Sequence, residues 1–292
     1  MQMNTDQKLY NSLLARHSTR RYQAKLVGDD GLLQVRQLSA SIEALDKDNK
    51  FEIKVYQYQP ETTNGKALGV YGHIMKPPFF FAPIITGTNN ALVDLGYRTQ
   101  QMVMNLWNEG FGSCYVGCAH RQNHVRHLMG ISDQSRIISF VIFGRPDKNK
   151  SLRLYQRISK FFTRSKDRLP YEKLFLGNQS TEKLLRDPVM KKILNAGRFA
   201  PSATNAQPWR FETRDKHFII YAHHKKIANL YDLEQGYAQH DTGICMANMS
   251  LAAKALGAEI HWQWASKDMI IQMPKGTDLP IAFFSLDSLR RF

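Results

Sequence analysis

The chain has 292 residues, of which 43% are hydrophobic and 11% aromatic, a composition that supports a globular core and excludes a disordered chain. Its three cysteines are too few for a disulfide framework, no apolar run approaches the ~20 residues of a membrane span, and no secretory signal is visible, so we expect a cytoplasmic protein. The formal net charge of +15 predicts attraction to phosphates, nucleic acid or an anionic membrane surface.

Helical and strand-like runs are mixed along the first half of the chain. The expected helices span residues 5–16, 30–45, 94–112 and 120–129, and the expected strands span 51–58, 79–86, 113–116 and 136–143. The run PPFFFAPII, near residues 77 to 85, is short and interrupted by prolines. We interpret it as a buried strand.

A strongly basic segment, residues 148–173, follows the first half. It holds nine Lys or Arg residues against Asp167 and Glu172. As a helix it would place its cations opposite its apolar side chains, and we interpret it as a linker helix with its charges in water. Anion binding or weak docking on a membrane surface is the alternative.

The second half repeats the mixture of helices and strands. A helix is expected over residues 188–199, followed by strands near 209–222, a helix over 241–258 and a strand over 259–264. Because helices and strands do not alternate strictly, the fold class we expect is α+β, with mixed sheets and flanking helices.

Two helical segments, residues 94–112 and 241–258, resemble each other. Asp, Gly, Met and a second Gly recur 147 residues apart, as Asp94, Gly96, Met102 and Gly110 and then as Asp241, Gly243, Met249 and Gly257. A shift of half the chain indicates an internal duplication. We therefore expect one half over residues 1–150, a basic linker over 151–180 and a second half over 181–292.

The segment ARHSTRRYQ follows the first expected helix and places Arg16, Ser18 and Arg20 at alternate positions. In an extended chain alternate side chains share a face, so two guanidinium groups and a hydroxyl would converge. Guanidinium groups bind phosphate oxygens in a bidentate manner, which makes this a candidate phosphate site. A basic turn facing solvent is the alternative.

The segment SCYVGCAH, residues 113–120, ends the next strand with small residues. Gly117 and Cys118 would let the backbone approach a flat ligand, although a tight strand-to-helix turn explains the same residues. His120, His124 and His127 share a helix face but lack a carboxylate partner, so we interpret them as a solvated face and expect no metal.

No nucleotide-binding glycine loop, nucleophile elbow or zinc-protease motif occurs in the chain. The sequence instead offers convergent cations, and in RFAPSATNAQPWRF, residues 198–211, a helix that stops at Pro201 and a loop of small polar residues. We expect Gln207 to Trp209 to be extended, with Trp209 in the core. Such a chain is suited to a phosphate-bearing cofactor that carries the chemistry itself.

Three of these segments resemble the nitroreductase family of FMN-dependent oxidoreductases. RHSTRRY resembles the R-x-S-x-R opening of the family, RFAPSATNAQPWRF resembles its A-P-S-x-x-N-x-Q-P-W segment, and RSKDRLPYEKL, residues 164–174, is similar to its basic C-terminal stretch. The resemblance implies that Arg16 and Ser18 contact the FMN phosphate and that Arg20 contacts the pyrimidine edge of the ring.

The resemblance assigns further residues to the cofactor. It implies that Lys166 and Arg168 also serve the phosphate, and that Gly117 and Cys118 lie by the flavin N5 edge. Pro201, Ser202 and Asn205 match positions that reach the flavin from the opposite subunit of the family's homodimers. Tyr115 and Val116 depart from the family's usual residues.

The order of the segments departs from the family's pattern, because the R-x-S-x-R segment lies in one half of the chain and APSATN in the other. We therefore expect a monomeric pseudo-dimer with one complete flavin site and one degenerate site. The implied function is two-electron, ping-pong transfer from NAD(P)H through FMN to a small nitroaromatic or quinone-like acceptor. A non-catalytic flavin-binding sensor or storage protein is the alternative, and no nucleic acid partner is expected.

Overall fold

The computed structural model describes residues 5–23, 35–87, 90–118, 121–147, 167–176, 181–223, 231–266 and 278–289. The chain divides into two compact units, which we call the first unit (Ala15–Thr163) and the second unit (Met1–Leu14 with Arg164–Phe292). The N-terminal helix α1 (Thr5–Ala15) thus belongs almost entirely to the unit formed by the C-terminal half. The sequence-based division into residues 1–150, 151–180 and 181–292 places this helix in the first half instead.

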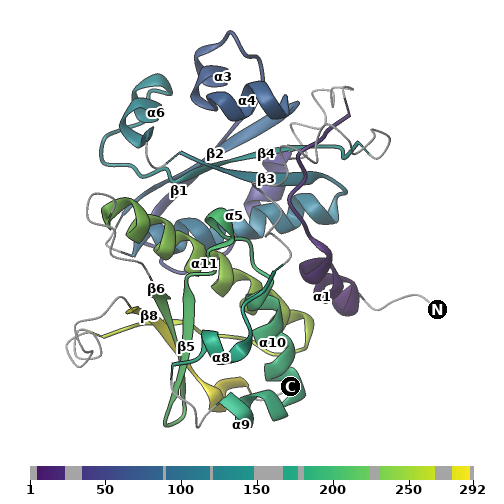
Figure 1. Cartoon of the computed structure of the whole chain (residues 1–292), viewed down its shortest axis with the longest axis vertical. Coiled ribbons are helices and arrows are strands. Elements are labelled where there is room, and N and C mark those ends of the chain that lie inside the picture. Colours follow the sequence, from purple (N-terminus) through teal and green to yellow (C-terminus); the bar gives the residue numbers. More distant parts are fainter. Residues whose placement is uncertain are drawn as a thin grey trace. The chain divides into compact units, whose positions relative to one another are not determined.

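The first unit is built on a four-stranded antiparallel sheet of order β1-β2-β4-β3 (Figure 1). Its strands are β1 (Lys50–Gln57), β2 (Phe79–Thr86), β3 (Gly112–Gly117) and β4 (Ser139–Gly144). These bounds agree with the expected strands to within three residues at each end.

The proline-interrupted run forms the buried strand β2, as predicted. Pro83 pairs with Ile53 of β1, whereas β4 pairs with β2 only at residues 79–81. On that same edge Ile85 donates its N–H to the carbonyl of Arg136, at 3.1 Å. Pro83 therefore lies in a gap between two bonded stretches, where its missing N–H costs no hydrogen bond.

Alternate residues of β2 serve two cores, one on each face of the first sheet. Phe80 packs with Val125 on the face covered by α3 (Thr63–Ala67), α4 (Val70–Met75) and α6 (Gln122–Leu128) (Figure 1). Phe79 and Phe81 pack with Met102 on the face covered by α5 (Ala91–Asn108). Burial on both faces explains why β2 is apolar throughout rather than alternating.

The helix expected over residues 30–45 is shorter at its C-terminal end than the sequence suggested. Residues 35–38 are helical, the 3-10 helix η1 spans Ser39–Ser41, and Ile42 is extended with φ −80° and ψ 119°. Residues 42–49 form a loop tied to α5, so tertiary contacts override the helical pattern there.

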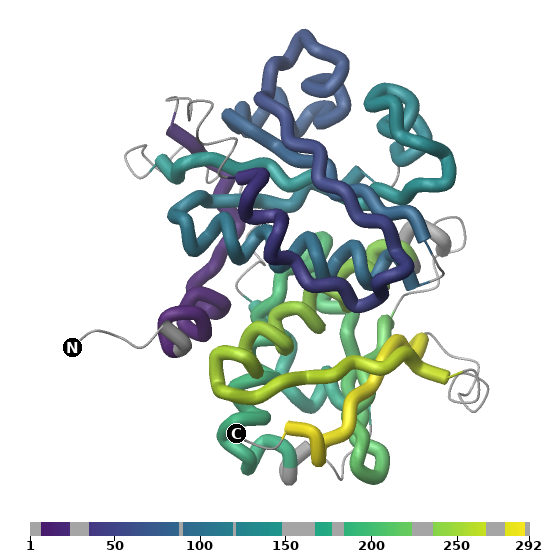
Figure 2. Tube along the Cα trace, turned by 180° about the vertical axis from the view of Figure 1, so that it is seen from behind, coloured from purple at the N-terminus to yellow at the C-terminus, as the bar shows by residue number. Residues whose placement is uncertain are grey.

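The second unit contains another antiparallel sheet, of order β5-β6-β8-β7, whose β5–β6 hairpin lies beside β8 (Figure 2). The strands are β5 (Trp209–Arg214), β6 (His217–His223), β7 (Gln263–Trp264) and β8 (Asp278–Ser285). The strand expected over residues 259–264 is thus limited to its last two residues. Trp209 is fully buried, as predicted.

Helices α10 (Pro188–Arg198) and α11 (Tyr231–Ala255) pack together in the second unit, and α11 also packs on β5 and β6. The side chain of Asp187 accepts the N–H groups of Val189 and Met190, so Asp187 is the N-cap of α10. Smaller helices complete this unit: α8 (Tyr171–Leu174), α9 (Thr181–Arg186), the 3-10 helices η4 (Ala203–Asn205) and η5 (Leu286–Leu289). The hydroxyl of Tyr10 in α1 donates to the carbonyl of Lys192 in α10, at 3.3 Å.

The two units share one topology. Each sheet has its strands in the order first, second, fourth, third, and each unit has its long helix between the second and third strands. Both long helices end at a left-handed glycine, Gly110 (φ 78°) or Gly257 (φ 71°). The next N–H, of Phe111 or Ala258, bonds the carbonyl five residues before it at 2.9 Å. This agreement supports the duplication predicted from the sequence.

The basic residues 148–166, including Lys166, lie outside the described residues, so an amphipathic helix there stays a prediction. Residues 167–170 of the same segment are described and are not helical. In the part of the chain that is described, no helix has the length and apolar character needed to cross a membrane.

Candidate functional site

The segment from Arg16 to Arg20 lies along the sheet of the first unit. Ser18 forms a parallel bridge with Ser113 of β3, and Thr19 donates its N–H to the carbonyl of Ser113 at 2.8 Å. Gly112 allows this close approach, because a Cβ atom there would lie 2.3 Å from Thr19 Oγ1. The alternation of Arg16, Ser18 and Arg20 is therefore held against a rigid strand.

The candidate residues Arg16, Ser18 and Arg20 all act on the thiol of Cys114 in β3, a residue to which the sequence assigned no role. Burial raises the pKa of the Cys114 thiol, while the charge of Arg20, a hydrogen bond with Ser18 and the charge of Arg16 oppose that rise. Each of the three side chains is thus close enough to the thiol to act on it. The sequence predicts the strand SCYV that contains Cys114. Its pairing with the Arg16–Arg20 segment, through Ser18 and Ser113, is seen only in the structure.

Arg16 is the most informative member of this cluster, because it is a buried cation. The residue is 8% exposed, and its Nη1 atom is buried with no hydrogen-bond partner among the described residues. Burial lowers the pKa of its guanidinium; Tyr115 and Cys114 oppose that effect and Arg20 adds to it. A buried guanidinium with an unused donor is costly unless an anion pairs with it, so the cluster suits a phosphate group.

Gly117 and Cys118, the other predicted residues of this unit, lie at the end of β3. Cys118 donates its N–H to the carbonyl of Ile138 at 2.9 Å, and its side chain is fully buried in an apolar cluster with Val116 and Phe140. Burial raises the pKa of its thiol to about 12. The thiol is therefore a core group, which leaves the backbone around Gly117 as the part able to face a ligand.

A second candidate region, in the second unit, is the loop that follows α10. Thr204, Asn205 and Gln207 have positive φ values of 50°, 59° and 48°. The expectation that Gln207 is extended is wrong; the extended strand begins at Trp209. A left-handed conformation costs a non-glycine residue about 1–2 kcal/mol, and such strain gathers at functional sites.

Polar contacts with residues 167–169 hold this loop. Arg168 donates to Asn205 Oδ1 at 2.5 Å and to the carbonyl of Phe199 at 3.2 Å. Asn205 Nδ2 donates to the carbonyl of Asp167 at 2.9 Å, and Gln207 Oε1 accepts the N–H of Leu169 at 2.9 Å. Arg168, predicted as a phosphate ligand, is thus bound to the loop. The side-chain role of Gln207 was not foreseen.

Ser202 and Ala203 are fixed from within the loop and from α11. Ser202 Oγ accepts the N–H of Gln207 at 2.9 Å, and Asp241 Oδ2 accepts the N–H of Ala203 at 2.7 Å. Pro201 precedes them and is partly exposed. In the sequence Asp241 stands out only as a member of the repeat, because 38 residues separate it from Ala203.

Within the described ranges, no group of three or more His, Cys, Asp or Glu side chains could hold a metal ion, and His120 lies outside those ranges. The first unit thus offers a pair of cations of which Arg16 is buried, and the second unit offers a strained loop of small residues.

The fold is that of the nitroreductases. The chain matches a crystal structure described as a putative nitroreductase from Thermotoga maritima with a TM-score of 0.62 and 17% identity, over 98% of this chain and 97% of that one. The model of the family described as "Putative TM nitroreductase" matches residues 8–253, so the chain belongs to that family.

Two further solved structures match in part. One is the NADPH:FMN oxidoreductase from Vibrio harveyi complexed with NAD+, with a TM-score of 0.46 and 18% identity over 59% of this chain and 77% of that one. The other is an FMN-dependent nitroreductase from Clostridium difficile R20291, with a TM-score of 0.41 and 15% identity over 48% of this chain and 88% of that one. No curated protein matches the chain.

Proposed function

We propose that this protein is an FMN-dependent NAD(P)H oxidoreductase of the nitroreductase type. The observation that carries the proposal is the buried, unpartnered Nη1 atom of Arg16, in a cluster with Ser18 and Arg20. The acceptor would be a small nitroaromatic or quinone-like molecule, reduced by two electrons in a ping-pong cycle in the cytoplasm. Membership of the nitroreductase family supports this reading.

The residues of the first unit would bind the cofactor. Arg16 and Ser18 would hold the FMN phosphate, and Arg20 would contact the pyrimidine edge of the ring. A cation at that edge favours added negative charge, so Arg20 would stabilise the reduced cofactor electrostatically. The backbone at Gly117 and Cys118 would lie by the N5 edge. When bound, FMN would supply the hydride and electron-transfer chemistry.

The residues of the second unit would complete the site. Pro201, Ser202 and Asn205 would lie against the ring, where small side chains leave room for a planar group. Lys166 and Arg168 would assist at the phosphate, although in the structure Arg168 bonds Asn205 and Phe199. The chain would act as a monomeric pseudo-dimer. Contact with a membrane surface through residues 148–173 would be weak, and no nucleic acid would take part.

The absorption spectrum of the purified protein tests this proposal. We expect a flavin spectrum after incubation with FMN, bleaching by NADPH or NADH without oxygen, and its return on addition of a quinone or a nitroaromatic compound. A chain that takes up no FMN would refute the proposal. Uptake without bleaching by either nicotinamide would instead establish the alternative, a flavin-binding protein without turnover.

A further inference from the structure

The two long helices anchor the segment that precedes the first strand of their own unit, and they do so at equivalent positions. Asp94 of α5 accepts the N–H of Leu45 at 2.9 Å, and Asp241 of α11 accepts the N–H of Ala203 at 2.7 Å. Seven residues further along each helix an amide side chain binds a carbonyl of a preceding segment: Gln101 binds Glu43 at 2.8 Å, and Asn248 binds Ala196 at 3.0 Å. The anchoring carboxylate is therefore a feature of the repeat.

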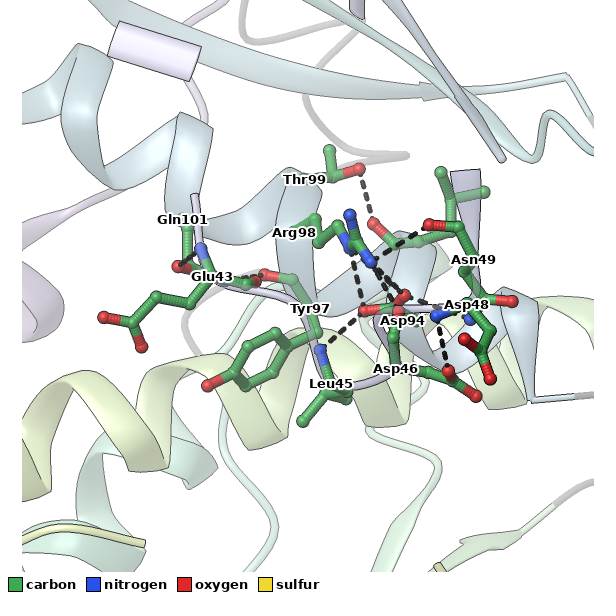
Figure 3. Close-up of polar contacts among 11 residues, drawn as sticks. Glu43, Leu45, Asp46, Asp48, Asn49, Asp94, Tyr97, Arg98, Thr99 and Gln101 are labelled. Atoms are coloured by element: carbon green, nitrogen blue, oxygen red, sulfur yellow. Dashed lines mark hydrogen bonds and ion pairs between the residues drawn. The ribbon is translucent and has the colours of Figure 1, made fainter. Parts of the chain in front are cut away.

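In the first unit the anchor serves a relaxed loop (Figure 3). None of the described residues 42–49 has a positive φ. Asp94 divides its oxygens among several donors, because it also accepts from Asn49 Nδ2 at 3.1 Å and forms an ion pair with Arg98 at 2.9 Å. The charge of Asp94 is thus balanced by a cation on the next turn of its own helix.

In the second unit the same anchor serves a strained loop. Ala203 directly precedes the left-handed residues Thr204 and Asn205, and its carbonyl accepts the N–H of Ala206 at 2.9 Å. The Ala203 amide is therefore the point at which the strained turn is fastened to a helix. Cys245 occupies the position that corresponds to Arg98, so the second anchor lacks that cation.

The other oxygen of Asp241 is held by a neighbour. His240 Nδ1 lies 3.2 Å from Asp241 Oδ1, and both side chains are almost fully buried. A buried carboxylate fixed on one oxygen presents the other in a defined direction, and a hydrogen bond to a charged acceptor is stronger than one between neutral groups. The contact is thus suited to offsetting the strain of the loop.

We infer that Asp241 is a positioning residue, whose carboxylate fastens the Ala203 amide and so keeps Ser202 and Asn205 in the conformation that FMN binding requires. The part of this inference that concerns FMN rests on the proposed function. The anchoring of the loop does not, and can be measured without cofactor.

Two variants remove the hydrogen bond between Ala203 and Asp241, one at the acceptor and one at the donor. Asp241→Ala removes the acceptor, whereas Ala203→Pro removes the N–H donor without altering the buried helix. Ser202 is extended, with φ −144° and ψ 159°, which is compatible with a following proline. Asp241→Asn keeps an oxygen able to accept the Ala203 N–H and is the conservative control. Asp94→Ala removes the equivalent anchor of the other unit and is the matched control.

Hydrogen exchange of the peptide covering residues 199–207, measured on the protein without FMN, reports the loop. We expect Asp241→Ala and Ala203→Pro to raise its exchange at least about tenfold and to raise the Kd for FMN by a similar factor, as for the loss of a charge-assisted hydrogen bond. Asp241→Asn should keep the exchange of residues 199–207 and the Kd for FMN close to those of the wild-type protein. Asp94→Ala should leave the exchange and the Kd unchanged even if it lowers overall stability.

Unchanged exchange in Asp241→Ala would overturn the inference. Faster exchange with an unchanged Kd would also overturn it, because the loop would be anchored for a reason unrelated to FMN. If the wild-type protein takes up no FMN, the proposed function fails, and the exchange data alone decide whether Asp241 fastens the loop.

Discussion

Arg16 is the residue on which the candidate phosphate site most depends. Its alternation with Ser18 and Arg20 is visible in the sequence, but its burial follows from the pairing of this segment with β3. A charged side chain is rarely buried without a counter-charge, because desolvation of the ion is costly. The Nη1 donor that has no partner among the described residues is what our proposal of an anion at Arg16 rests on.

Replacement of this cation should have opposite effects on stability and on cofactor binding. Arg16→Met keeps most of the side-chain volume but removes the uncompensated charge, so we expect a higher urea midpoint for the protein without FMN. The Kd for FMN should rise at least about 30-fold, corresponding to about 2 kcal/mol for the loss of a buried charge partner. Urea unfolding and flavin fluorescence titration measure the two effects.

Arg145→Ala is the control for the Arg16 variant. Arg145 lies in the same unit, stacks on Phe111 with 4.1 Å between its Cζ atom and the ring centroid, and donates to the carbonyl of Glu109. Its removal should leave the Kd for FMN unchanged. A Kd that is equally unchanged in Arg16→Met would show that the cluster does not bind the cofactor.

At the scale of elements, β3 acts as the support of the candidate phosphate site. It holds the Arg16–Arg20 segment through the Ser18–Ser113 bridge and carries Cys114, whose thiol interacts with Arg20, Ser18 and Arg16. The approach is so close that Gly112 has no room for a side chain. The geometry of the site thus depends on a residue that has no functional group.

A methyl group on Gly112 should disturb the site through Thr19. Because the added Cβ would lie 2.3 Å from Thr19 Oγ1 and 2.6 Å from Thr19 Cβ, Gly112→Ala must displace the segment from β3. We expect the Kd for FMN to rise at least about tenfold, together with a loss of about 1–3 kcal/mol of stability, the range typical of overpacked sites. Titration with FMN and urea unfolding test both.

The double variant Gly112→Ala with Thr19→Gly restores the lost space. It should recover part of the affinity for FMN if steric displacement is the cause. Failure of the single variant to change the Kd would mean that the position of this segment on β3 does not matter for binding.

At the scale of the whole molecule, the duplicated topology carries two loops of different character. The loop at residues 42–49 is relaxed and tied by Asp94, Arg98 and Gln101, whereas the loop at residues 199–207 contains three left-handed residues. The second half also lacks an R-x-S-x-R segment. A duplicated fold with these unequal parts favours one complete site in each chain.

We therefore expect one FMN per chain in a monomer of 33.6 kDa. Native mass spectrometry after incubation with excess FMN measures both the stoichiometry and the assembly state. Asp94→Ala, which alters only the relaxed loop, should leave the stoichiometry at one. Two bound FMN molecules per chain would contradict the asymmetry of the two halves.

Much of the fold could be predicted from the sequence because its signals are local. Periodicity identified α5, α10 and most of the strands, and the Asp and Gly residues of the repeat indicated the duplication that the two equivalent sheets support. Small helices such as α3 and α4 were missed, because five or six residues carry too little periodicity. The candidate ligands Arg16, Ser18 and Arg20 were found by their spacing alone.

Tertiary structure alone decided which distant residues meet. Three features depend on residues far apart in the chain. They are the packing of α1 in the second unit, the interaction of Cys114 with the candidate ligands, and the hydrogen bond from Ala203 to Asp241. Thr204, Asn205 and Gln207 are left-handed although none of them is a glycine, so nothing in the sequence signals this conformation. Local propensity cannot encode such features, because strand pairing and helix packing create the contacts that hold them in place.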